Sequence, residues 1–161
     1  MLGTIVLSLD SIFAGAALRF FGLRKKHWPL AWRTVGLADL AALLIGRGMS
    51  GVIRAPMASC QQATLFAVCA LVAILLGRLC SDRPRVMILG VAVLFSIDNL
   101  LAGAHFASLS SSAFVAVTTG ILSCVMCVSG LHAAATIAVY VRPRVSFGLA
   151  SVAVVTAFLV F

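Results

Sequence analysis

The sequence predicts an all-α polytopic membrane protein whose six transmembrane helices form a 3+3 inverted repeat. Composition is the first reason: hydrophobic residues make up 63% of the 161 residues, charged residues make up 10%, and the mean hydropathy is +1.18. The second reason is a motif containing an aspartate, which occurs twice within apolar runs. About six short spans leave almost no room for a soluble module. We therefore expect residues 1–161 to form a single membrane domain that is not an enzyme.

Six apolar segments are long enough to be spans, because a spanning helix needs about 20 apolar residues. Lipid offers no partner to unpaired backbone groups, and the alternation typical of barrel strands is absent, so each segment is expected to be helical. The first segment lacks the basic region of a signal peptide and is interpreted as a span. Arg47 and four glycines interrupt the second. The predicted spans cover about residues 1–18, 34–50, 62–79, 86–106, 113–140 and 144–161.

The net charge of +8 is best explained by membrane topology rather than by nucleic-acid binding. Ten of the twelve basic residues fall in the first, third and fifth loops, whereas the second loop has Arg47 and Arg54 and the fourth, around 108–112, has none. Basic loops face the cytoplasm, so both termini are expected outside a multi-pass protein of the cell (inner) membrane. The ten residues are Arg19, Arg24, Lys25, Lys26, Arg33, Arg78, Arg83, Arg85, Arg142 and Arg144.

Two internal similarities predict a duplication. The stretch 6–18 (VLSLDSIFAGAAL) returns 88 positions later at 94–106 (LFSIDNLLAGAHF), with Ser, Asp, Ala, Gly and Ala in register. A fainter match, offset by 84, pairs TVGLADLAALLIG with TTGILSCVMCVSG and sets Asp39 against Ser123. The half-repeats are then residues 1–81 and 86–161. Three helices per half is an odd number, so the second half is inverted, as in many secondary transporters.

The repeated aspartates are the main candidates for a binding site. A carboxylate in hydrocarbon costs about 2.5–3.5 kcal/mol, so two at matching points are unlikely to be accidental. At about 1.5 Å per residue, both lie near the middle of a core about 30 Å thick. Two carboxylates neutralise one divalent ion, and hard oxygen ligands suit Mn²⁺, Mg²⁺ or Ca²⁺. The predicted metal ligands are Asp10, Asp98, Asp39, Asn99, Ser8 and Ser96.

The pattern Ser-hydrophobic-Asp followed by small residues, at 8–11 and again at 96–99, resembles the manganese efflux pumps of the MntP type in the LysE superfamily of exporters. The stretch GLADLAALLIG (36–46) is similar to that family's second helix, with Asp39 where glutamate is usual. The resemblance covers nearly the whole chain. It implies export of Mn²⁺ with the aspartates as ligands. The stretch 96–99 also resembles tellurium-resistance membrane proteins of the same superfamily.

The leading hypothesis is a secondary transporter that exports a divalent cation by alternating access. No G-x-x-x-x-G-K-[ST] motif is present, so protons are the expected counter-ion, and no resident cofactor is expected. The partners are then the transported metal ion and the lipid bilayer. Two other substrates stay open, Cd²⁺ and a cationic amino acid such as lysine.

Other interpretations of single residues also stay open. Cys124 and Cys127 share a helix face, so they could serve a membrane thiol oxidoreductase, bind soft metals, or simply pack. Asp10 and Asp98 could bridge helices through serines. Asp39 could pair with Arg33 or Arg47. The histidines at 105 and 132 are expected to make local hydrogen bonds, although a proton-relay role for the second stays open.

Overall fold

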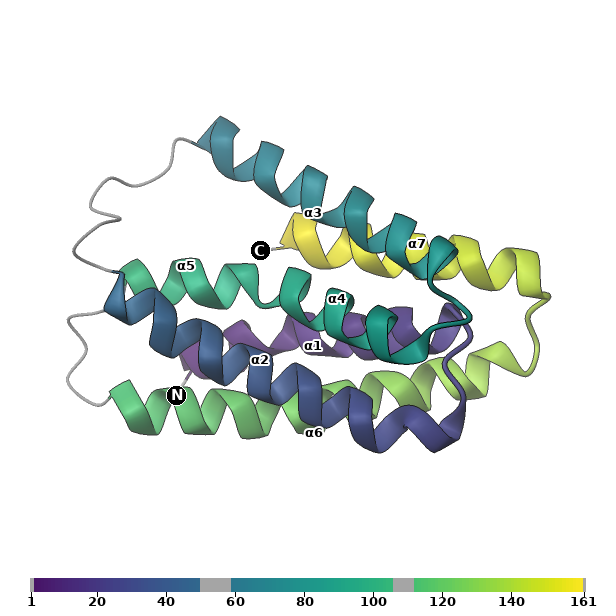
Figure 1. Ribbon diagram of the computed structural model, residues 1–161, viewed down its shortest axis with the longest axis horizontal. Coiled ribbons are helices and arrows are strands. Elements are labelled where there is room, and N and C mark those ends of the chain that lie inside the picture. Colours follow the sequence, from purple (N-terminus) through teal and green to yellow (C-terminus); the bar gives the residue numbers. More distant parts are fainter. Residues whose placement is uncertain (1, 50–58, 106–111, 161) are drawn as a thin grey trace.

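The computed structural model describes residues 2–49, 59–105 and 112–160, and over these ranges its regular secondary structure is all helical, with short connections at 21–24, 80–83 and 139–142 (Figure 1). Four helical segments, 25–48, 61–79, 84–104 and 113–138, are long and apolar enough to cross a membrane, and 145–157 is a shorter apolar helix. This is compatible with a multi-pass membrane protein. The elements are α1 (Leu2–Phe20), η1 (Lys25–His27), α2 (Trp28–Gly48), α3 (Ser59–Leu79), α4 (Pro84–Phe95), α5 (Ile97–His105), α6 (Ser112–Ala138) and α7 (Pro143–Val160).

Prolines define several helix starts. The sequence predicts that the second span begins at residue 34. The helix α2 begins earlier, at Trp28, because Pro29 lies in its first turn, where a missing N–H costs nothing. Pro84 likewise begins α4. The predicted boundaries at residues 1, 50, 106 and 161 lie outside the described residues, as do Arg54 and residues 108–111 of the fourth loop.

The fourth predicted span is not one continuous helix, contrary to expectation. It divides at Ser96, whose backbone angles (φ −87°, ψ 2°) leave the helical region. The Ser96 hydroxyl donates to the carbonyl of Ala92, at 2.8 Å, one turn earlier. Such back-bonding by serine bends helices, so the break needs neither proline nor glycine. It leaves Asp98 in the first turn of α5.

Glycines bring α1 and α6 into direct backbone contact. A Cβ atom on Gly15 would collide with the carbonyl oxygen of Cys127, and one on Gly130 would collide with that of Ile12. Small residues at such crossings are typical of helix packing in membranes.

The same arrangement joins α2 to α5. A Cβ atom on Gly46 would collide with the carbonyl oxygen of Leu100, and one on Gly103 with that of Leu43. A third crossing, at Gly36 and Gly120, brings α2 against α6.

The other helices pack around this four-helix unit. α7 contacts α1, α4 contacts α1 and α2, and α3 lies against α4 and α7 (Figure 1).

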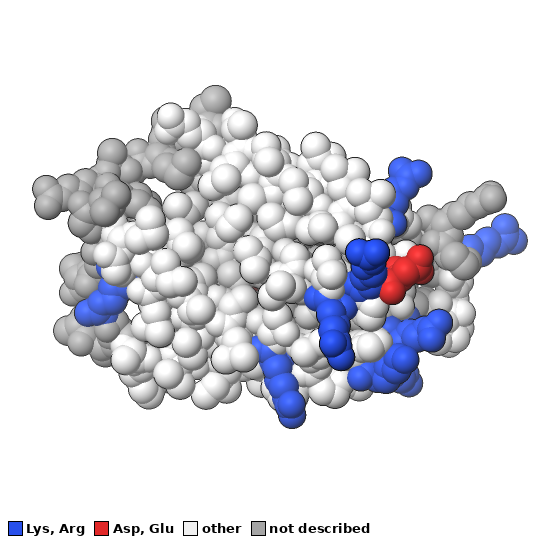
Figure 2. Space-filling model, viewed as in Figure 1, with Lys and Arg blue, Asp and Glu red and all other residues white. Residues whose placement is uncertain are grey.

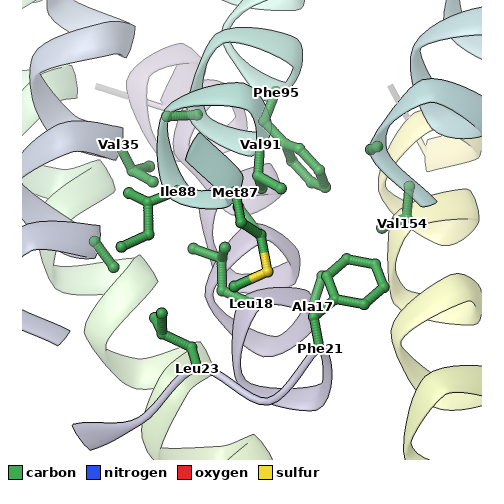
Figure 3. Close-up of a cluster of buried hydrophobic side chains, with 14 of the residues drawn as sticks. Ala17, Leu18, Phe21, Leu23, Val35, Met87, Ile88, Val91, Phe95 and Val154 are labelled. Atoms are coloured by element: carbon green, nitrogen blue, oxygen red, sulfur yellow. The ribbon is translucent and has the colours of Figure 1, made fainter. Parts of the chain in front are cut away.

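A buried apolar cluster packs between α1, α2, α4 and α7 and reaches the connection that joins α1 to α2 (Figure 3). Leu18 stands eight residues beyond Asp10 on α1, which is about 12 Å along the helix. The labelled members of this apolar cluster are Ala17, Leu18, Phe21, Leu23, Val35, Met87, Ile88, Val91, Phe95 and Val154. Nε of Arg19 and Nε1 of Trp28 are also buried at this end of the bundle, without a partner among the described residues.

Apolar side chains cover the flanks of the bundle and basic ones its end. Leu37, Phe114 and Ile121 are 65%, 70% and 61% exposed, as expected of surfaces that face lipid rather than water. Most Lys and Arg side chains visible in Figure 2 gather where α1 leads into α2 and α3 into α4. We call this the basic end. The N-terminus of α1 and the C-terminus of α7 point toward the opposite end (Figure 1).

The crossing of α2 and α5 gives a matched pair of glycine substitutions. Gly46→Ala is expected to destabilise the fold by about 1–3 kcal/mol, because the new methyl group meets backbone that cannot rotate away. Gly48→Ala, two residues along the same helix, has open space around its Cβ and is expected to be neutral or slightly stabilising. Thermal unfolding in detergent, followed by circular dichroism, compares them. Equal midpoints for the two variants would contradict the close approach.

Candidate functional site

Three aspartates from three helices meet in the interior of the bundle. Asp10 on α1 and Asp39 on α2 are 3% and 1% exposed, and Asp98 on α5 is partly buried. The Asp10 carboxylate is within electrostatic range of the other two, and Asp98 is within range of Asp39. The fold therefore brings together all three acids that the sequence places within predicted spans.

Asp39 lies at the centre of the group and links the two copies of the aspartate motif. Its Oδ2 accepts a hydrogen bond from Ser11 of the first copy, at 3.0 Å. Its Oδ1 lies 2.5 Å from the hydroxyl of Ser96 of the second copy, which shares its single proton between this oxygen and the carbonyl of Ala92. One carboxylate thus ties α1, α2 and the α4–α5 break together.

The two repeated aspartates have less complete surroundings. Asp10 Oδ1 lies 3.3 Å from the Ser11 hydroxyl, which is already closer to Asp39. Asp98 Oδ1 accepts the backbone N–H of Asn99, at 2.7 Å, in the manner of an acid in the first turn of a helix. Ser8 donates toward the carbonyl of Thr119 at 3.5 Å.

Several buried polar atoms beside the aspartates have no hydrogen-bond partner within the described part of the chain. They are Oδ2 of Asp10, both polar atoms of the Asn99 side chain, and the hydroxyls of Thr119 and Ser123. Ser123 and Asn99 lie close to Asp39 without completing a hydrogen bond to it. Native interiors leave few such atoms without a partner, so a cluster of them needs an explanation. Helix-bridging by serines accounts for Ser11 and Ser96 but not for this cluster.

No basic side chain neutralises the three acids within the described residues. The groups that act on each carboxylate are other aspartates, serines, Asn99 and backbone N–H groups. The proposed pairing of Asp39 with Arg33 or Arg47 is not observed, because Arg33 is exposed and lies over the ring of Trp32, 5.1 Å from its centroid. Nη1 of Arg47 is buried without a described partner.

The aspartates are neighbours rather than a closed coordination shell. Over the described ranges, no three His, Cys, Asp or Glu side chains approach closely enough to hold one metal ion. A cation bound here would draw the remaining ligands from serine, threonine and asparagine oxygens. The arrangement can stabilise a desolvated cation, because it offers carboxylates and neutral oxygens in a region of low dielectric.

The thiols of the C-x-x-C pair lie beside the aspartates, with Cys124 within electrostatic range of Asp39 and Cys127 within range of Asp39 and Asp10. Cys124 and Cys127 are free thiols at two helix crossings, the first with its sulfur against Gly36 and the second fully buried opposite Gly15. The ring of His132 packs edge-on against Trp28, with centroids 4.9 Å apart. The side chains at 60 and 105 lie outside the described residues.

Three polar residues of the site, Ser11, Thr119 and Ser123, are not among the six predicted metal ligands. Ser123 carries a sequence signal, since the weaker internal repeat pairs it with Asp39. Thr119 lies one helical turn before Ser123 and so shares its face. Both side chains are fully buried (0% exposed), which only the packed structure reveals.

The fold and site define a helical bundle with apolar flanks and an acidic, hydroxyl-rich centre. Comparison with known proteins adds no relative: no family model, no curated protein and no solved structure matches the chain.

The bonds to Asp39 are testable through stability. Ser11→Ala and Ser96→Ala each remove a donor to a buried carboxylate and are expected to cost about 1.5–3 kcal/mol. Ser129→Ala is the control, because that hydroxyl bonds only within its own helix on an exposed face. Thermal unfolding in detergent measures the three variants. A midpoint for Ser11→Ala equal to that of Ser129→Ala would show that Asp39 does not depend on this donor.

Proposed function

We propose that the protein is a secondary transporter that exports a divalent metal cation, with Mn²⁺ as the preferred substrate and Asp10 and Asp98 as the charged ligands. The observation that carries this proposal is the cluster of buried polar atoms without partners beside three aspartates that have no described basic neighbour. Buried carboxylates are costly unless something compensates their charge. A cation that enters the group supplies that compensation.

The ligand chemistry favours a hard dication over a soft one. Two carboxylates balance a double positive charge, and the neutral oxygens of Ser8, Ser96 and Asn99 complete a set that suits Mn²⁺, Mg²⁺ or Ca²⁺. Cys124 and Cys127 are within electrostatic range of Asp39, so a softer ion such as Cd²⁺ stays the alternative substrate. The resemblance of the aspartate motifs to MntP-type pumps selects Mn²⁺ among the hard ions.

The proposed inverted repeat is supported by the pattern of helix contacts. Gly130 contacts Ile12, and Gly46 contacts Leu100. The two glycines are 84 residues apart in the sequence, and their partners, Ile12 and Leu100, are 88 residues apart. These are the two offsets of the internal sequence repeats. The contacts of Gly15 with Cys127 and of Gly103 with Leu43 follow the same two offsets.

Alternating access follows from the difference between the two ends of the bundle. Toward the basic end, the apolar cluster separates the aspartates from the loops. Toward the opposite end, Ser123 and Thr119 continue a buried polar line along α6. With the basic end in the cytoplasm, this conformation is closed inside, and the cation leaves along α6. The cycle also requires a conformation in which the apolar cluster opens.

Replacing either charged ligand is expected to abolish transport. In inside-out vesicles, Asp10→Asn and Asp98→Asn should reduce Mn²⁺ uptake to the level of vesicles without the protein, because each variant removes one of the two proposed charged ligands. The double variant Cys124→Ser/Cys127→Ser is the control and is expected to keep its rate. Loss of activity in the control with full activity in both aspartate variants would instead favour a thiol oxidoreductase.

Proton counter-transport predicts the direction of the pH effect. The lumen of an inside-out vesicle corresponds to the exterior, so exported Mn²⁺ enters the lumen while protons leave it. An acidic lumen is therefore expected to accelerate uptake several-fold, and a proton ionophore to remove the acceleration. Uptake that is the same with and without the gradient would contradict proton coupling but not export itself.

A further inference from the structure

A cavity lies at the basic end, away from the aspartates. It has a volume of about 370 Å³ and opens between the α1–α2 connection and the α3–α4 turn. Its floor includes Leu23 and Met87, which are 1% exposed and belong to the apolar cluster. The other lining residues are Gly22, Arg24, Lys26, His27, Ser81, Asp82 and Pro84.

The lining groups favour an anion with several oxygen atoms. Arg24 and Lys26 bring two positive charges, and neither side chain has a hydrogen bond or ion pair among the described residues, although Asp82 lines the same cavity. A guanidinium can hold two oxygens of a phosphate at once, while an ammonium acts as a point charge. The first turn of α4 starts at Pro84 and contains no acidic residue, so its partial positive charge is not offset there.

The cavity does not belong to the cation route. Positive side chains at its walls repel a dication, and the buried side chains of its floor lie between it and the aspartates. Its place at the ends of apolar helices, close to Trp28 at the start of α2, is the level at which lipid headgroups and aromatic anchors meet.

We propose that this cavity binds a phosphate group, supplied either by the headgroup of an anionic phospholipid or by free phosphate. Arg24 and Lys26 hold the phosphate oxygens, with His27 and Ser81 beside them. A bound phosphate joins the α1–α2 connection to the α3–α4 turn. It thereby braces the basic end over the apolar cluster. This site is independent of the transport proposal and does not rely on it.

Tryptophan fluorescence gives a direct readout, because the chain has two tryptophans and both lie near the start of α2, Trp28 immediately after His27 of the cavity wall. The full chain in dodecyl maltoside is titrated with sodium phosphate, with sodium chloride at matched ionic strength, and with dihexanoyl phosphatidylglycerol. We expect a saturable change with phosphatidylglycerol, with phosphate, or with both, and none with chloride. A response to phosphatidylglycerol alone identifies the headgroup as the source, and a response to phosphate identifies the free anion.

A charge-matched pair of variants tests the residues. Arg24→Gln/Lys26→Gln is expected to weaken the apparent affinity about tenfold or more, since it removes charged hydrogen bonds. Lys25→Gln/Arg85→Gln removes the same charge from exposed residues that do not line the cavity, and is expected to bind like the parent chain. The proposal is overturned if neither phosphate source gives a saturable response, or if the two double variants bind equally.

Discussion

The carboxylate of Asp39 is the constraint on which the rest of the interior depends. A carboxyl side chain that is 1% exposed needs hydrogen-bond partners, and it finds them in Ser11 on α1 and Ser96 at the α4–α5 break. Those two bonds bring both copies of the aspartate motif to one point. The positions of Asp10 and Asp98, and their mutual repulsion, follow from this placement.

Close helix packing makes the acidic centre possible. Glycines at the crossings let α1, α6, α2 and α5 approach until their backbones touch, which leaves no room for large side chains between them. Larger apolar side chains, among them Met87, Ile88 and Phe95, form the apolar cluster beside it. The same molecule therefore has a polar centre next to an apolar cluster, and the cavity at the basic end has the opposite electrostatic character from the aspartates.

Much of the site was predictable from the sequence, and the exceptions have physical reasons. Burying an acid is costly enough that the duplicated motif marked Asp10 and Asp98 directly. The sequence did not predict whether Asp39 faces the other aspartates or pairs with Arg33 or Arg47, which flank it. Only the direction of α2 turns its side chain inward. No proline or glycine in the sequence predicts the break at Ser96, because a hydrogen bond from the serine hydroxyl to the preceding turn causes it. The spacing of Cys124 and Cys127 does not predict that these residues lie at helix crossings, because the crossings depend on glycines far away in the chain.

The glycine crossings also decide which parts of the bundle can move as rigid bodies. Each one joins a helix from residues 1–81 to a helix from residues 86–161, so the two half-chains are interlocked and cannot swing past each other as separate blocks. The layer of α3, α4 and α7 has no described glycine crossing with the four-helix unit, and α4 leaves that unit through the joint at Ser96. α4 therefore joins the interlocked unit at this serine, next to the carboxylates themselves.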